Sequence, residues 1–66
     1  MTNDDIARLG HYYAAHLLDC ARLAWEDLPN VTEAEFAEVA FVIELVAVGL
    51  RERAGTRGAE LWKAAQ

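Results

Sequence analysis

A run of apolar residues in the middle of the chain constrains the fold more than any other feature. Residues 39–50 read VAFVIELVAVGL, and Glu44 is the only residue of this run that is neither apolar nor glycine. The run is too short to cross a bilayer, because a membrane-spanning helix needs about 20 apolar residues. A helix that is apolar nearly all round needs partners on most sides. We therefore expect this segment to lie between several neighbours.

The flanking residues favour a helix over a buried strand, which periodicity alone cannot separate for so short a run. Thr32 is a favourable N-cap, and Glu35 stands three residues later, as a capping box requires. Arg51 suits the last turn of a helix, and Gly55 supplies an end. We predict a helix over residues 32–54.

The predicted helix carries more than one row of apolar or small side chains. A core seam with 3-and-4 spacing is formed by Phe36, Val39, Ile43, Val46 and Leu50. A second seam, about 100° to the side, is marked by Val42, Leu45 and Gly49. Steps of seven residues separate three alanines that would permit close approach in a dimer, Ala40, Ala47 and Ala54.

An earlier helix is predicted over residues 3–27, with Thr2 as its N-cap and Pro29 beyond its end. One side of it is a narrow polar seam: Asp5, Arg8, Tyr12, Ala15, Asp19, Arg22 and Glu26. Along this seam Asp19 and Arg22 have the spacing of an exposed ion pair. The rest is apolar, in two rows: Ile6, Leu9, Tyr13, Leu17, Cys20 and Ala24, then Ala7, His11, Ala14, Leu18, Ala21, Trp25 and Leu28.

The connection over residues 28–31 is short, and short links join antiparallel helices. Gly55 and Gly58 frame a second break, after which a short helix over residues 58–65 is expected to dock through Trp62. We predict one all-α domain over residues 1–66, an antiparallel two-helix hairpin with a short C-terminal helix. We expect two hairpins to form a homodimeric four-helix arrangement with the helix of residues 32–54 near the axis.

The length of the chain supports this expectation of self-association. A domain of 66 residues has marginal stability unless something supplements its core. Cys20 is the only cysteine, so no disulfide can form within the chain, and a single thiol suits the cytoplasm. The first ten residues, MTNDDIARLG, do not have the pattern of a signal peptide.

The charge is unevenly distributed along the chain. The net charge of −5 argues against direct binding to nucleic acid or to an anionic membrane. At the open end of the predicted hairpin, Asp4 and Asp5 are expected near Arg51 and Arg53. Near the predicted hairpin turn the sequence places an acidic end, which consists of Glu26, Asp27, Glu33, Glu35 and Glu38. Such an end could dock on a basic groove of a protein partner. Solvation and the helix dipole also account for these acids.

Candidate catalytic and metal-binding residues are few. His16 and Cys20 are four residues apart on one helix face, but no further ligand or base accompanies them, so we interpret them as core or interface residues. We expect Glu44 on an exposed strip with Glu38 and Arg51, although a dimer contact is the alternative. The sequence predicts no catalytic site, metal site or cofactor, and we do not expect an enzyme.

Aromatic residues near the N-terminus offer a second interpretation of one helix face. His11, Tyr12 and Tyr13 could form a recognition patch, because tyrosine is enriched in binding hot spots. The alternative is that Tyr13 packs in the core and Tyr12 is an ordinary surface residue.

These features favour a small protein that inhibits or regulates a larger protein by occupying its surface. In size, acidity and lack of catalytic residues, the chain is similar to the stand-alone inhibitors that bacteriophages encode, including anti-CRISPR proteins. That likeness is one of general character. The alternative is a structural subunit or assembly factor whose apolar face is buried in a complex. The expected dimer or partner face consists of Phe41, Val42, Leu45, Val48, Leu18 and Trp25.

Overall fold

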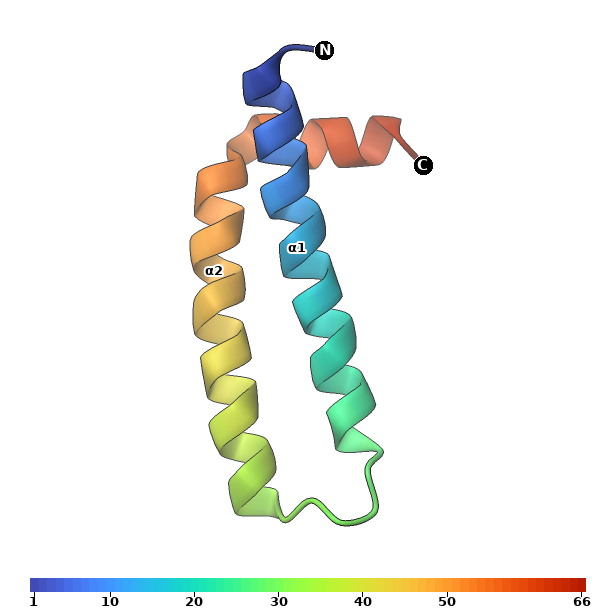
Figure 1. Ribbon diagram of the computed structural model, residues 1–66, viewed down its shortest axis with the longest axis vertical. Coiled ribbons are helices and arrows are strands. Elements are labelled where there is room, and N and C mark those ends of the chain that lie inside the picture. Colours follow the sequence, from blue (N-terminus) through green and yellow to red (C-terminus); the bar gives the residue numbers. More distant parts are fainter.

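The computed structural model describes residues 1–66 and contains two α-helices that pack against each other, with no strand (Figure 1). Helix α1 spans Asn3–Glu26, and helix α2 spans Glu33–Ala64. The connection between them reverses the chain, so the two helices run antiparallel, as Figure 1 shows. The predicted all-α helical hairpin is confirmed.

Threonine caps start both helices, but the two caps differ in completeness. The Thr2 hydroxyl accepts a hydrogen bond from the Asp5 backbone N–H at 3.1 Å, and the Asp5 carboxylate accepts one from the Thr2 N–H at 3.5 Å. This is a complete capping box. The Thr32 hydroxyl accepts from the Glu35 N–H at 3.2 Å, and only this half of the predicted box forms there.

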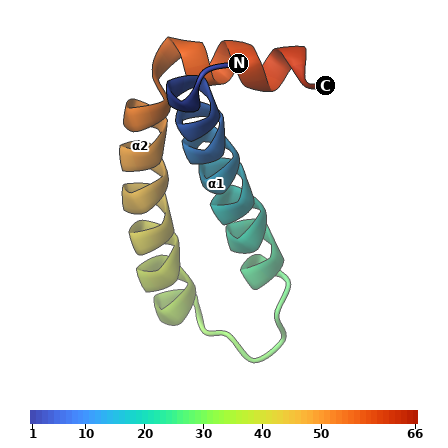
Figure 2. The same cartoon turned by 45° about the horizontal axis from the view of Figure 1, so that its top comes forward.

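Helix α2 bends sharply at Gly55, whose φ of 64° and ψ of −171° lie in a region that favours glycine. Residues 56–64 therefore leave the direction of residues 33–54 and cross α1 near its start (Figure 2). The segment predicted as a separate short helix is the last part of α2 in this structure. A Cβ at Gly58 would lie 2.9 Å from the Arg8 carbonyl oxygen, so this crossing requires glycine there.

Alanines form the tightest contact of the hairpin. Ala15, Ala47 and Ala54 are each 0% exposed, whereas no large side chain is fully buried. Small side chains allow two helix backbones to approach closely. We predicted a dimer contact for the alanines of α2, but Ala47 and Ala54 are already covered within the hairpin, where α1 is the only other helix.

The side of α1 that faces α2 is also different from the prediction. It includes the polar seam, in which Arg8, Asp19 and Arg22 are partly buried beside Ala15. The Asp19 carboxylate pairs with Arg51 on α2 and not with Arg22. A hairpin is one layer thick, so charged groups at its edges keep contact with water, and long side chains such as arginine can cover apolar surface with their aliphatic stems.

The helices consequently leave much of their apolar surface uncovered. On α1 the exposed side chains include Ile6, Tyr13, Leu17 and Leu23. On α2, Val46 was predicted in the core seam, but it is 49% exposed, because the side of α2 that faces α1 carries Ala47 and Ala54 instead. The expected exposed strip through Glu44 is present, since Glu38, Glu44 and Arg51 are all exposed.

Candidate protein-binding surfaces

The acidic end lies around the connection between the helices, and all five of its carboxylates belong to exposed residues. The helices diverge towards this connection, as Figures 1 and 2 show. The divergence opens a hollow of about 300 Å³ whose lining residues are Trp25, Glu26, Val31, Thr32, Glu33 and Phe36. The acidic end therefore surrounds a partly apolar depression and is not a uniformly charged surface.

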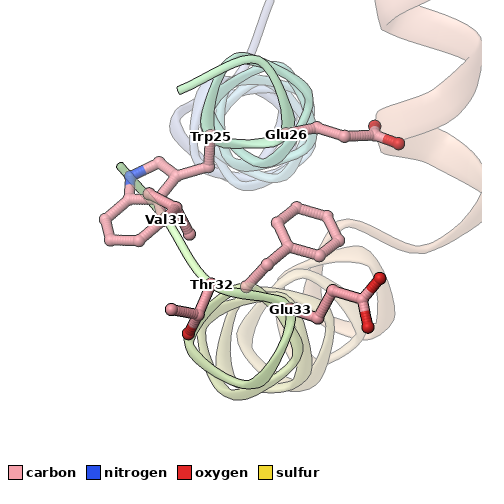
Figure 3. A pocket seen from close by; sticks show the side chains of 6 residues that line it. Trp25, Glu26, Val31, Thr32 and Glu33 are labelled. Carbon is pink, nitrogen blue, oxygen red and sulfur yellow. The ribbon is translucent and has the colours of Figure 1, made fainter. Parts of the chain in front are cut away.

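Charged and apolar side chains lie on opposite sides of this hollow. Figure 3 shows Glu26 and Glu33 reaching to one side, one from each helix, while Trp25 and Val31 lie on the other side. Trp25 is partly buried and lines the hollow. It therefore lies apart from the exposed apolar residues of α2 with which it was expected to form one partner face. A basic side chain could place its stem against the aromatic wall and its charge beside the carboxylates.

A second surface lies on the side of α2 that faces away from α1. We call it the outer α2 surface, and it consists of Phe41, Val42, Leu45, Val46 and Val48. Phe41 is 66% exposed and Leu45 is 64% exposed. A shallow depression of about 340 Å³ lies over part of it, lined by Phe41, Glu44, Leu45 and Val48. Leu18, which was predicted in the same face, is partly buried on α1.

The C-terminal part of α2 docks on α1 through aromatic contacts. The Trp62 ring centroid lies 5.2 Å from that of Tyr13, 5.1 Å from that of His16 and 5.9 Å from that of Tyr12. The expected docking of Trp62 is confirmed. Tyr12 and Tyr13 therefore contact Trp62, while the Nδ1 atom of His11 is buried without a hydrogen-bond partner.

His16 and Cys20 are brought together, as their spacing indicated. The Cys20 Sγ lies 3.7 Å from the His16 Nε2, and both residues are exposed. No group of three or more histidine, cysteine or acidic side chains is arranged to hold a metal ion. No stretch of either helix is both apolar enough and long enough to span a bilayer.

Ion pairs fix the open end of the hairpin. Arg57 forms a bidentate ion pair with Asp5, in which Nε donates to Oδ1 at 3.1 Å and Nη2 donates to Oδ2 at 3.2 Å. Arg8 pairs with Asp4 at 2.8 Å and also donates from Nη1 to the Ala54 carbonyl oxygen at 3.3 Å. We expected Asp4 and Asp5 to approach Arg51 and Arg53. The bend at Gly55 instead brings Arg57 onto Asp5.

The hydrogen bonds from Arg57 lower the pKa of Asp5 below its usual value of 3.8, and they raise the pKa of Arg57. A carboxylate whose pKa is lower when folded stabilises the fold above its unfolded pKa and loses that effect as the pH falls. We expect docking of residues 56–64 to weaken as the pH falls below about 3.9. In Asp5→Asn this loss of docking at low pH should disappear, and the docking of residues 56–64 should already be weaker at pH 7.

Fluorescence of Trp62 in a Trp25→Phe background, titrated from pH 7 to pH 2, measures this effect. Asp4→Asn is the matched control, since Asp4 contacts Arg8 and not the C-terminal part of α2. Identical acid transitions in the wild type and in Asp5→Asn would contradict the assigned role of Asp5.

Some of these features had a signal in the sequence and others did not. The acids near the turn and the Trp62 anchor could be read from their positions. The hollow between Trp25 and Phe36 depends on how far the helices diverge, and no residue pattern reports that. In comparisons with known proteins, no family model, no curated protein and no solved structure matches this chain.

Proposed function

We propose that this protein acts by binding another protein, which it inhibits or regulates by occupying part of that protein's surface. The observation that carries the proposal is the balance between buried and exposed apolar groups. Only 4 of the 66 residues are buried, and eleven large apolar side chains are exposed, with Phe41, Leu45 and Val42 among the most exposed. Large exposed apolar patches mark interaction sites.

The proposed recognition surface for the larger partner is the acidic end with its hollow. Five carboxylates would attract a basic groove and speed association, while Trp25 would act as an anchor in the depression. Inhibitors of the kind that bacteriophages encode work by such occupation. We propose binding and not catalysis, no direct contact with nucleic acid, and a location in the cytoplasm, in keeping with the single cysteine.

We further propose that the protein works as a homodimer. The hairpin by itself buries no large side chain fully, and a second copy would supply the missing cover. The alternative function is that of a structural subunit or assembly factor, for which the exposed outer α2 surface is the supporting observation. A subunit without its complex should aggregate or bind a hydrophobic dye, whereas an inhibitor should remain monodisperse.

Charge reversal at the acidic end tests the proposed recognition. In the triple variant Glu26→Lys, Asp27→Lys and Glu33→Lys, we expect the association rate with the captured partner to fall about 10-fold or more at low salt, because electrostatic steering is lost. The difference should shrink at high salt, where charges are screened. Stopped-flow or surface-based kinetics against the partner, isolated by affinity capture, measures it.

A matched variant separates the position of the charges from their number. The triple change of Asp4, Glu52 and Glu60 to lysine uses three exposed acids that lie away from the turn and outside the outer α2 surface, and it also brings the net charge from −5 to +1. This control should keep most of the association rate. Equal rates for the wild type and the acidic-end variant at low salt would rule out the proposed recognition.

A further inference from the structure

We infer that the outer α2 surface is the contact with a second copy of this chain, and that the two α2 helices cross antiparallel near Leu45. The inference rests on the proposed homodimer and adds to it the surface and the orientation. Four observations carry it: the area left uncovered, the concentration of apolar groups on one helix side, an unexplained glycine and the charges at the two ends of that side.

The uncovered area has the size that a dimer requires. The accessible surface of the chain is 4882 Å², whereas a compact monomer of 7.3 kDa is expected to expose about 4,200 Å². The excess of about 700 Å² is close to the roughly 800 Å² that each partner buries in a standard stable interface. The radius of gyration, 13.9 Å, also exceeds the roughly 11 Å of a compact chain of this length.

The excess is concentrated on α2. The five residues of the outer α2 surface are between 46% and 66% exposed, and they follow one another within two turns of helix. Gly49 lies on the same side, and a Cβ placed there would meet nothing within 4 Å. Glycine weakens a helix interior and nothing inside this chain requires it. Because Gly49 has no side chain, a second helix could approach the backbone closely at this point.

The charges favour an antiparallel arrangement of the two copies. One row of this side consists of Glu35, Val42, Val46 and Arg53, with spacings of seven, four and seven residues. The order of charged and apolar residues is therefore the same from either end of the row, except that one end is acidic and the other is basic. A two-fold axis near residue 44 would set Glu35 of each copy beside Arg53 of the other. A parallel pair would instead set Glu35 against Glu35.

These two residues cannot pair within one chain. They lie at opposite ends of the straight part of α2, about 27 Å apart at 1.5 Å per residue. Arg53 forms no ion pair in the structure, unlike Arg51 and Arg57. It is therefore available to the second copy.

The first test is the solution mass of the full chain by light scattering over a dilution series. The wild type should have a mass near twice 7.3 kDa. Leu45→Glu should raise the dissociation constant of the dimer at least about 30-fold, since a residue at the centre of an interface is a hot spot. Leu45 is 64% exposed in the hairpin, so circular dichroism should show an intact helical fold.

Leu17→Glu is the matched control, because Leu17 is an exposed leucine of α1 and lies away from the outer α2 surface. It should keep the dimer. A dimer that survives Leu45→Glu but dissociates in Leu17→Glu would overturn the inference and leave the proposed homodimer standing. A monomeric wild type would overturn both, and it would leave the outer α2 surface to a different protein.

A charge exchange tests the orientation. Glu35→Arg and Arg53→Glu should each weaken the dimer several-fold, and the double variant should restore it, because the introduced arginine of one copy would then face the introduced glutamate of the other. Absence of this rescue would overturn the antiparallel arrangement. Binding of the larger partner is measured with an acidic-end variant that keeps both Glu35 and Arg53, so failure of the proposed function remains distinguishable from failure of this inference.

Discussion

Ala47→Leu is expected to destabilise the packing of α2 on α1. Ala47 is 0% exposed where α2 packs on α1, so the added atoms have no space unless the backbones move apart. Overpacking of this kind costs about 1–3 kcal/mol and occasionally more. A domain of 66 residues has a free energy of unfolding of only about 3–10 kcal/mol. Urea unfolding followed by circular dichroism measures the change.

Ala37→Leu is the matched control, because Ala37 is an exposed alanine on the same helix. It should change the free energy of unfolding by less than about 0.5 kcal/mol. The loss in Ala47→Leu should also be independent of protein concentration, since its contact lies within one chain. A loss that grew with dilution would show instead that Ala47 lies between two copies, because only dimer stability depends on protomer concentration.

The hairpin itself could be predicted because its signals are local. Thr2 and Thr32 cap the two helices, and Pro29 prevents one from continuing into the other. A short link then leaves an antiparallel arrangement as the simplest outcome. The acidic end follows directly from these boundaries, since its five residues flank the turn.

The rotation of each helix about its own axis could not be predicted. Both helices carry more than one apolar row, and burying either row gains a similar free energy per unit of area. The structure turns Ala15 and Ala47 inward, and it is stabilised by ion pairs between distant parts of the chain, Asp19 with Arg51 and Asp5 with Arg57. Periodicity reports which residues share a side, but it does not report which side meets the neighbour.

The candidate surfaces depend on that rotation. Val46 was predicted in the core and is exposed, so it joins the outer α2 surface. Leu18 and Trp25 were predicted on a partner face and are partly buried on α1. The direction of the bend at Gly55, which selects Tyr13 and His16 as contacts of Trp62, is likewise a property of the folded backbone.

Trp62→Ala is expected to release the C-terminal part of α2 from α1. The substitution removes ring contacts with Tyr12, Tyr13 and His16, and each aromatic pair contributes about 0.5–1.5 kcal/mol beyond the area that it buries. Residues 56–64 are too few to be stable as an isolated helix. We therefore expect their backbone amides to lose protection against hydrogen exchange while the rest of the hairpin keeps it, as resolved residue by residue by NMR.

Trp25→Ala is the control for this result, because Trp25 is the other tryptophan, is also partly buried and lies at the opposite end of the hairpin. It should leave the protection of residues 56–64 unchanged. Trp62→Phe should retain much of the docking, since a smaller ring can still meet Tyr13 and His16. If residues 56–64 stayed protected in Trp62→Ala, the ion pair of Arg57 with Asp5 and the close contact at Gly58 would suffice to hold them. The aromatic contacts would then follow from docking, and Asp5→Asn would be the variant that releases the segment.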